Sequence, residues 1–178
     1  WFTDENNTAG YIYLVRDPRS VVLSYAHYAN IDLKEATKLL LNSGATGSSD
    51  KEGLVVDIRS SWKNNYLSWK KARKYKGLII RYEDLVENSF LHFKKILLFL
   101  QNYMDIKIDD KKIKNCINSC EFKNLKKMEK NLGFYEAIEN RDFFRKADIN
   151  EWKKELDDKL KYEIESNFKN EMKELGYI

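Results

Sequence analysis

Apolar residues occur in two short unbroken runs and in longer stretches where they recur every three or four positions. The runs are Tyr-Ile-Tyr-Leu-Val at residues 11–15 and Leu-Ile-Ile at residues 78–80. Their length and their lack of polar alternation predict strands that are buried on both faces. The periodic stretches predict helices over about 18–29, 32–41, 55–76, 89–103, 109–119 and 149–175, with a helical turn or two at 122–129.

Residues that start and stop helices mark several of these boundaries. Asp17 can cap the helix that begins at Pro18, because a carboxylate accepts from free backbone N–H groups and proline is tolerated in a first turn. Gly77 ends the helix that precedes the second strand. Glycines and serines within residues 42–50 predict a mobile loop, and residues 131–140 are predicted to be irregular.

The order of strand, helices, strand and helices predicts a helix-rich α/β fold with parallel strands. Trp62, Tyr66 and Trp69 form one stripe on the helix between the strands, and we interpret this stripe as core packing. No repeat or linker divides the chain, so residues 1–178 are interpreted as one domain. Two strands are too few for a whole doubly wound sheet, and the chain begins with Trp1 rather than Met, so we expect further strands upstream.

Charge and composition narrow the possible partners. Charged residues make up 34% of the chain and hydrophobic residues 43%, an ordinary globular mixture. The net charge is +4, but acidic residues are interleaved almost everywhere, which argues against a nucleic-acid binder. No apolar run approaches the roughly 18 residues of a membrane span. A small site for a polyanionic ligand fits this balance, and so does a solvated surface with no partner.

The cysteines and histidines do not predict a metal site. Cys116 and Cys120 lie four positions apart, and the only histidines are His27 and His92. A zinc site needs more ligands close together, so we expect two reduced core cysteines in a cytoplasmic protein. Abundant Lys, Asn and Ile with a single proline favour a bacterial source.

Candidate chemistry appears where the first strand gives way to a helix. Arg16 ends the strand, in the position where open α/β sheets bind ligands beyond the carboxyl ends of their strands. A guanidinium there can fork onto a phosphate, a serine hydroxyl can add a hydrogen bond, and the helix N-terminus favours anions. The alternative is a structural arginine that caps the strand or pairs with Glu83 or Asp84.

Residues 13–25, Tyr-Leu-Val-Arg-Asp-Pro-Arg-Ser-Val-Val-Leu-Ser-Tyr, resemble the 3′-phosphate-binding segment of cytosolic-type sulfotransferases. These enzymes use 3′-phosphoadenosine 5′-phosphosulfate (PAPS) as the sulfonate donor and release 3′-phosphoadenosine 5′-phosphate (PAP). In the family, an arginine after a strand and a serine further along the helix bind the 3′-phosphate. The resemblance therefore implies that Arg16 and Ser24 bind this phosphate.

Two further segments resemble the adenosine-binding parts of the same family. Residues 78–85, Leu-Ile-Ile-Arg-Tyr-Glu-Asp-Leu, are similar to the strand whose tyrosine lies beside the adenosine, which implies this role for Tyr82. Residues 121–123, Glu-Phe-Lys, resemble the segment whose phenylalanine stacks on adenine, which implies this role for Phe122.

A fourth segment resembles the family's Arg-Lys-Gly loop, which closes over the 3′-phosphate. It reads Phe-Phe-Arg-Lys-Ala at residues 143–147 and is followed by Glu-Trp-Lys at residues 151–153. The resemblance implies that Arg145 and Lys146 contact the 3′-phosphate. Ala147 replaces the usual glycine, so this loop is less free to approach a ligand closely.

Other departures from the family concern catalysis and assembly. The family's Lys-Ser-Gly-Thr-Thr loop and its Lys-Thr-His strand are absent from residues 1–178, so no catalytic residue is assigned and the chain alone is predicted to be inactive. His27 lies three positions after Ser24, but the family's base comes from upstream, and we interpret His27 as a surface or packing residue. Asp157-Asp158 stands where the family's dimer motif has Thr-Val, so that dimer is not expected.

The resemblance implies a P-loop-kinase-like fold, a parallel sheet with flanking helices, of which this chain holds the C-terminal part. It implies transfer of a sulfonate group from PAPS to a small-molecule hydroxyl or amine, without a metal. The alternatives are a non-enzymatic helical module that binds a protein or nucleic acid, and an ATP-using P-loop kinase relative.

Overall fold

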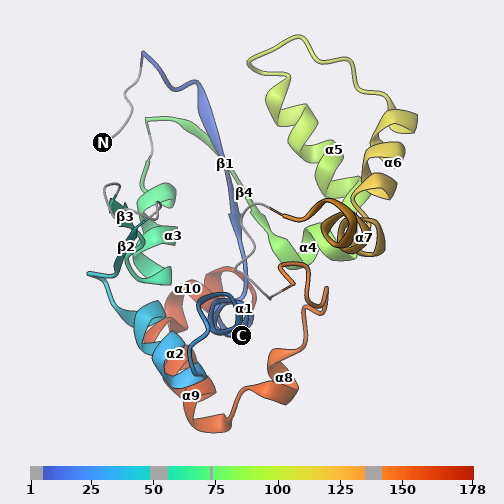
Figure 1. Ribbon diagram of the computed structural model, residues 1–178. Helices are drawn as coiled ribbons and strands as arrows, with labels where there is room; N and C mark the ends of the chain where they lie inside the picture. The colour runs from blue at the N-terminus through green and yellow to red at the C-terminus, as the bar shows by residue number, and fades with distance from the viewer. Residues whose placement is uncertain (1–5, 49–55, 73, 135–141) are drawn as a thin grey trace.

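A two-stranded parallel sheet forms the centre of the computed structural model, which describes residues 6–48, 56–72, 74–134 and 142–178 (Figure 1). Strand β1 (Gly10–Val15) pairs with β4 (Lys76–Arg81) in parallel, with Val15 opposite Arg81 at the carboxyl end. Both apolar runs are therefore strands. The expectation of burial on both faces is wrong for β1, because Ile12 is 40% exposed and Leu14 is 49% exposed on one face.

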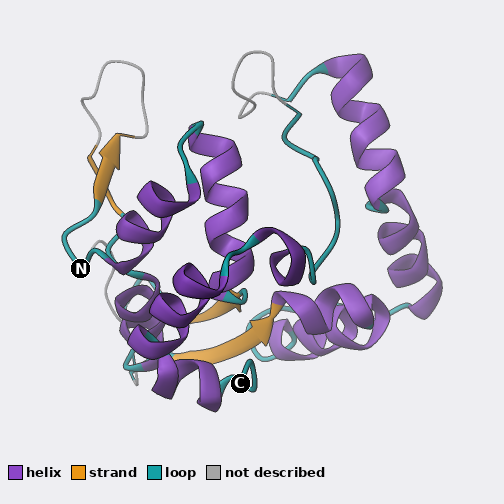
Figure 2. Ribbon diagram, turned by 90° about the horizontal axis from the view of Figure 1, so that it is seen from below, coloured by secondary structure: helices purple, strands orange, loops and turns teal. Residues whose placement is uncertain are grey.

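Helices surround these two strands (Figure 2). A short antiparallel hairpin, which the sequence did not predict, joins β2 (Thr46–Ser48) to β3 (Val56–Ile58). The helices are α1 (Pro18–Ala29), α2 (Leu33–Leu41), α3 (Trp62–Lys70), α4 (Tyr82–Glu87), α5 (Ser89–Leu100), α6 (Asp110–Ser119), α7 (Phe122–Leu132), α8 (Trp152–Glu155), α9 (Asp158–Asn167) and α10 (Lys169–Glu174). The chain is thus a helix-rich α/β structure with a small parallel sheet, as predicted.

The hydrophobic core lies on the α3 side of the sheet. It joins Val15 at the end of β1 to helices α1, α2, α3, α8, α9 and α10. The aromatic stripe of α3 packs as expected: the Trp62 ring lies 5.1 Å from the Phe168 ring, and Trp69 lies 5.2 Å from Tyr11. Burial of large rings such as these is the main stabilising contribution to a core of this kind.

Two of the predicted helices are wrong in their extent. The helix expected over 55–76 is only α3, because Ser60 has a positive φ of 56° and Ser61 then caps the helix by accepting from Asn64 N. The single helix expected over 149–175 is three short ones. Its chain turns extended at Leu156, after which the Asp157 carboxylate accepts from Leu160 N and starts α9.

Helices α5, α6 and α7 lie on the other side of the sheet and bury little. No residue of α5 or α7 is buried, and Ile113 is the buried residue of α6. Cys116 and Cys120 are exposed free thiols, so the expectation that they belong to the core is wrong. Of the segment predicted to be irregular, residues 131 and 132 are helical and 135–140 lie outside the described residues. None of the described helices is long and apolar enough to cross a bilayer.

Candidate nucleotide-binding site

A cavity of about 950 Å³ opens beside the carboxyl ends of β1 and β4. It is bounded by α1, α4, the end of α6, the start of α7 and the segment 142–151 (Figure 1). The structure brings all the residues singled out from the sequence as ligand contacts to this one cavity, although they come from distant parts of the chain. They are Arg16, Ser24, Tyr82, Phe122, Arg145 and Lys146.

Arg16 lies at the floor of the cavity, directly after β1. Its Nη1 donates to the Ser24 hydroxyl at 3.0 Å, and its guanidinium lies 4.7 Å from the centre of the Tyr82 ring. The arginine Nε is buried and has no hydrogen-bond partner among the described residues. Buried donors are seldom left unpaired, so this guanidinium retains capacity for an anionic ligand.

The turn that carries Arg16 is fixed by contacts from three elements. Trp62 Nε1 donates to the carbonyl oxygen of Arg16 at 3.0 Å, and Glu83 Oε1 accepts from Asp17 N at 3.0 Å. Glu83 therefore serves the backbone and is not an ion-pair partner of Arg16. The Tyr177 hydroxyl donates to Glu83 Oε2 at 3.0 Å, and burial together with this carboxylate raises the pKa of Tyr177. Sequence reasoning did not find this support, because the partners are far apart in the chain.

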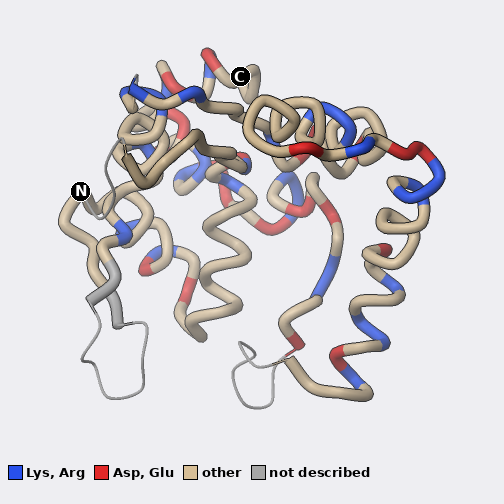
Figure 3. The backbone as a smooth tube through the Cα atoms, turned by 90° about the horizontal axis from the view of Figure 1, so that it is seen from above, with Lys and Arg blue, Asp and Glu red and all other residues tan. Residues whose placement is uncertain are grey.

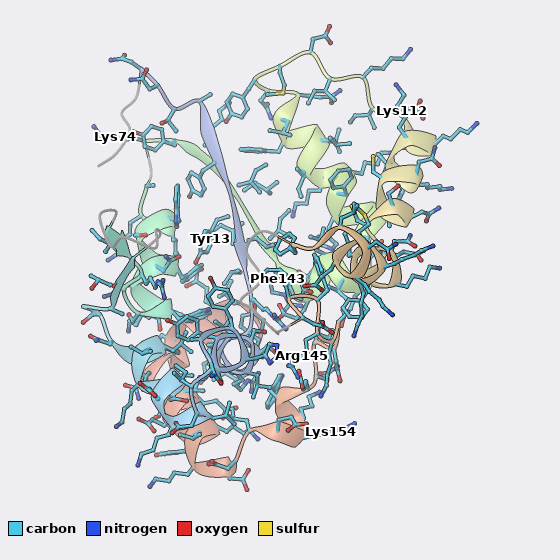
Figure 4. All side chains as sticks on the ribbon, in the orientation of Figure 1. Tyr13, Lys74, Lys112, Phe143, Arg145 and Lys154 are labelled. Carbon is cyan, nitrogen blue, oxygen red and sulfur yellow. The ribbon has the colours of Figure 1, made fainter. Side chains whose placement is uncertain are left out.

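The segment 142–151, which carries Phe143 and Arg145 (Figure 4), lines the other side of the cavity. Hydrogen bonds anchor this segment at both ends. Glu129 of α7 accepts from Phe143 N at 2.5 Å and from Phe144 N at 3.0 Å. At the other end, the Ser20 hydroxyl donates to the Ile149 carbonyl at 3.2 Å. The segment therefore bridges α7 and α1 without forming a helix or strand of its own.

Arg145 and Lys146 both bind the carboxylate of Glu151. Arg145 donates through Nη1 and Nη2 to the two carboxylate oxygens, and Lys146 Nζ donates to Oε1 at 2.8 Å. Burial raises the pKa of Glu151, but the hydrogen bonds from Arg145 and Lys146 outweigh it and lower the pKa below its ordinary value. Sequence reasoning did not find this contact, although Glu151 lies within the segment that carries the resemblance.

The end of the cavity nearest α7 is apolar. Phe122 is the first residue of α7 and is half-buried, and Leu125 lies beside it in the lining. Phe143 and Phe144 extend this surface, with their ring centres 5.3 Å apart. Partly exposed aromatic rings such as these suit a planar base, which stacks on the face of a single ring.

Carboxylates also line the cavity, since acidic and basic residues are interspersed along the chain (Figure 3). Glu121 pairs with Lys123 at 2.7 Å, and Asp142 lies 3.6 Å from Lys126. Asp148 accepts from Asn150 N at 2.8 Å. Lys123 and Lys126 therefore offset part of the negative charge of Glu121 and Asp142 that would oppose an anion.

His27 also lines the cavity, with Nε2 3.2 Å from the carbonyl oxygen of Asp142. This contact places the imidazole at the edge of the segment 142–151. Across the residues that the structure describes, no group of three or more His, Cys, Asp or Glu side chains is arranged to hold a metal ion.

A family model described as the sulfotransferase domain matches residues 5–176 of this chain. The chain belongs to the sulfotransferase family. Among curated proteins, the "Cytosolic sulfotransferase 14" of Arabidopsis thaliana is 30% identical over 83% of this chain and 44% of its own length. The "Amine sulfotransferase" of Oryctolagus cuniculus is 22% identical over 96% of this chain and 56% of its own. These relatives come from a plant and a mammal and give no support to a bacterial source.

Solved sulfotransferase structures share this fold. Mouse sulfotransferase SULT7A1, solved in complex with PAP, superposes with a TM-score of 0.69 at 22% identity, over 92% of this chain and 58% of that one. A retinol dehydratase in complex with androsterone and PAP superposes with a TM-score of 0.65 at 20% identity, over 91% and 47% of the two chains. This sulfotransferase chain therefore spans about half the length of the relatives it matches.

Proposed function

We propose that this chain binds the adenosine and 3′-phosphate end of PAPS in a sulfotransferase that acts on a small-molecule hydroxyl or amine. The observation that supports this most directly is the convergence of six residues, chosen from sequence segments far apart, on one cavity. Arg16 adds to it, because its hydrogen bond to Ser24 uses only one of the five N–H donors of the guanidinium.

The 3′-phosphate of PAPS would contact basic and polar side chains, and its adenine would contact aromatic ones. Arg16 and Ser24 would bind the 3′-phosphate from the helix α1 side, and Arg145 and Lys146 would approach it from the opposite wall. A guanidinium matches the spacing of two phosphate oxygens, while an ammonium supplies a point charge. Phe122 would stack on the adenine, and Tyr82, already in contact with Arg16, would lie beside the nucleoside.

These residues would bind and orient the donor, which converts an encounter into a positioned reactant. The groups that would activate the acceptor and stabilise the leaving oxygen have no counterpart that we can assign in residues 1–178. We therefore propose that these residues alone do not transfer sulfonate, because general acid–base help contributes about 10²- to 10⁴-fold and electrostatic stabilisation a comparable factor.

Domain organisation and location are proposed as well. We propose that residues 1–178 act as one domain, since the core joins both ends of the described chain. A cytosolic location is proposed from the names of the plant relatives. A dimer of the family type is not proposed, because Asp157 and Asp158 begin α9 where that motif would require Thr-Val.

Calorimetric titration of this chain with PAP, 5′-AMP and ATP tests the nucleotide assignment. Tighter binding of PAP than of 5′-AMP is expected, because only PAP carries the 3′-phosphate. Preference for ATP would favour the kinase alternative, and no binding of any of the three would favour an interaction module.

An assay of PAP release from PAPS, with a panel of hydroxyl and amine acceptors, tests the inactivity of residues 1–178. No turnover above the uncatalysed rate is expected. Turnover that disappears in His27→Ala would contradict the proposal and identify His27 as a base.

A further inference from the structure

Glu151 lies between the two basic side chains of the segment 142–151 and holds both. Its side chain is only 11% exposed, and its two oxygens accept from Arg145 and Lys146. The next residue, Trp152, is buried under the guanidinium of Arg19, whose Cζ lies 3.7 Å from the ring centre. The carboxylate is therefore attached to a fixed point of the core, unlike the two cations that it binds.

The cations need such a point because the hydrogen bonds that anchor the segment 142–151 hold its backbone and not these two side chains. Residues 142–151 form no helix or strand, and both side chains are long. Ordering a long side chain on binding lowers affinity, so a site that is ordered beforehand binds more tightly. Glu151 accepts two of the N–H donors of Arg145 and one from Lys146, which leaves further donors on both for a phosphate.

We propose that Glu151 is a positioning residue that orders Arg145 and Lys146 at the wall of the cavity before the 3′-phosphate binds. This inference rests on the proposed function of the cavity. It assigns Glu151 no contact with the nucleotide, since its effect passes through the two cations.

A competing role gives the opposite sign. If Glu151 were only a counter-ion that occupies the phosphate-binding groups, then neutralising it would add one positive charge to the site and strengthen PAP binding. If Glu151 positions the cations, then the same change lets them move and weakens PAP binding. Whether neutralising Glu151 weakens or strengthens PAP binding therefore distinguishes a positioning role from a counter-ion role.

Glu155 provides a matched control. It lies one turn further along, its carboxylate is 3.9 Å from Lys146 Nζ, and its side chain is 54% exposed. Glu155→Gln removes the same charge close to the same cation without removing a hydrogen bond that holds Arg145. An effect of charge alone would shift PAP binding in the same direction in Glu151→Gln and Glu155→Gln.

The test is calorimetric titration of the 178-residue chain and its variants with PAP and with 5′-AMP, alongside thermal unfolding. Glu151→Gln is expected to weaken PAP about 10-fold, the effect of one or two side chains that must be ordered on binding, and to leave 5′-AMP unchanged. Glu151→Asp keeps the charge and should recover part of the loss. Glu155→Gln should leave PAP unchanged or bind it slightly more tightly.

A double-mutant cycle adds a second readout. In an Arg145→Ala, Lys146→Ala background, Glu151→Gln should have no further effect on PAP, because no cation remains to be positioned. Unchanged or tighter PAP binding by Glu151→Gln would overturn the inference, and so would an equal loss for PAP and 5′-AMP. If Glu151→Gln does not fold, Glu151→Asp decides on the same criteria. Failure of the proposed function looks different: the unmodified chain would then not prefer PAP over 5′-AMP.

Discussion

The two sides of the central sheet differ sharply in how they are packed. The packed half, α1–α3 with α8–α10, contains the hydrophobic core, including Val22, Ile164 and Met172 with no measurable exposure. In the open half, α4–α7, the described buried side chains are Glu83 and Ile113. Yet helix α5 of the open half is more apolar in sequence than α1, α2, α3 or α9 of the packed half. Its sequence is Ser-Phe-Leu-His-Phe-Lys-Lys-Ile-Leu-Leu-Phe-Leu. Apolar composition alone therefore does not decide which half becomes the core.

The candidate site spans this boundary, and its two ends make different demands. Phosphate recognition depends on the direction of charged donors, and Arg16 is held by Ser24 and by the Trp62 contact to its carbonyl group. Base stacking depends mainly on a flat ring, and Phe122 begins a helix with no buried residue. The proposed anion site is thus fixed on the packed half, and the proposed base site lies on the less buried open half.

The largest expected effect is on stability, in a matched pair of leucines. Leu160→Ala removes a side chain that is 8% exposed in α9 and should lower the free energy of unfolding by about 2–5 kcal/mol. Leu98→Ala removes one that is 52% exposed in α5 and should cost less than about 1 kcal/mol. Denaturant unfolding measures both. Equal losses would contradict the division into two halves and indicate that α5 is covered in solution.

The next effect concerns the anion site on the packed half. Arg16→Ala removes charge-assisted hydrogen bonds worth about 1.5–3 kcal/mol, so PAP should bind roughly 10- to 150-fold more weakly while 5′-AMP is barely affected. Calorimetric titration with both nucleotides measures this difference.

Lys130→Ala is the control for Arg16→Ala, because it removes an exposed cation of α7 that does not line the cavity. Arg16→Lys keeps the positive charge but loses the two-pronged hydrogen bonding of a guanidinium. Its affinity for PAP should therefore lie between those of the parent chain and the alanine variant. If Arg16→Ala weakened the binding of PAP and of 5′-AMP to a similar extent, the assignment of the 3′-phosphate to Arg16 would be wrong.

The predictions from sequence were most accurate where a short sequence pattern by itself determines the local structure. The Asp17-Pro18 pair predicted the start of α1, and Asp17 does accept from Arg19 N at that end. The Trp62, Tyr66 and Trp69 stripe predicted a core face, because helical spacing puts these rings on one side. Arg16 was singled out because it ends a strand, and it lines the cavity beside the carboxyl ends of β1 and β4.

The sequence did not reveal features that depend on contacts between distant residues. Nothing local in the sequence marks the structural contacts of Glu83, Tyr177 and Glu151, yet the first two hold the turn after β1 and the third binds Arg145. The break at Leu156 was missed because the apolar period continues through it. The exposed cysteines were missed because α6 packs only one residue, Ile113, into the interior.

A smaller effect tests the base site on the open half. Phe122→Ala should weaken both PAP and 5′-AMP, by the roughly 1–3 kcal/mol that stacking on one ring contributes, because both nucleotides carry the adenine. Thermal unfolding should change little, since Phe122 is not part of the core. Met128→Ala, which removes an exposed side chain of the same helix outside the cavity lining, is the control. If Phe122→Ala were strongly destabilised, and the fraction that still folds bound both nucleotides normally, then Phe122 would be a packing residue and not a base-stacking residue.

The smallest expected effect is a pH dependence at the rim of the packed half. Hydrogen bonds from Lys70 at 2.5 Å and Tyr66 at 3.1 Å lower the pKa of Glu174 below its ordinary value of 4.5, more than burial raises it. A carboxyl whose pKa is lower in the folded chain stabilises it at pH values above the unfolded pKa, and this contribution disappears as the pH falls through the folded pKa.

Glu174→Gln should therefore lower the free energy of unfolding by less than about 1 kcal/mol at pH 7, because both members of the Lys70 pair are partly exposed. As the pH falls from the ordinary carboxyl pKa of 4.5 through the lower pKa of the folded chain, the parent chain and the variant should converge, since Glu174 becomes protonated in both states of the parent chain. Denaturant unfolding from pH 7 down to the acid limit of folding measures the gap. A gap that stays constant as the pH falls would show that Glu174 acts through packing against Tyr66 and not through its charge.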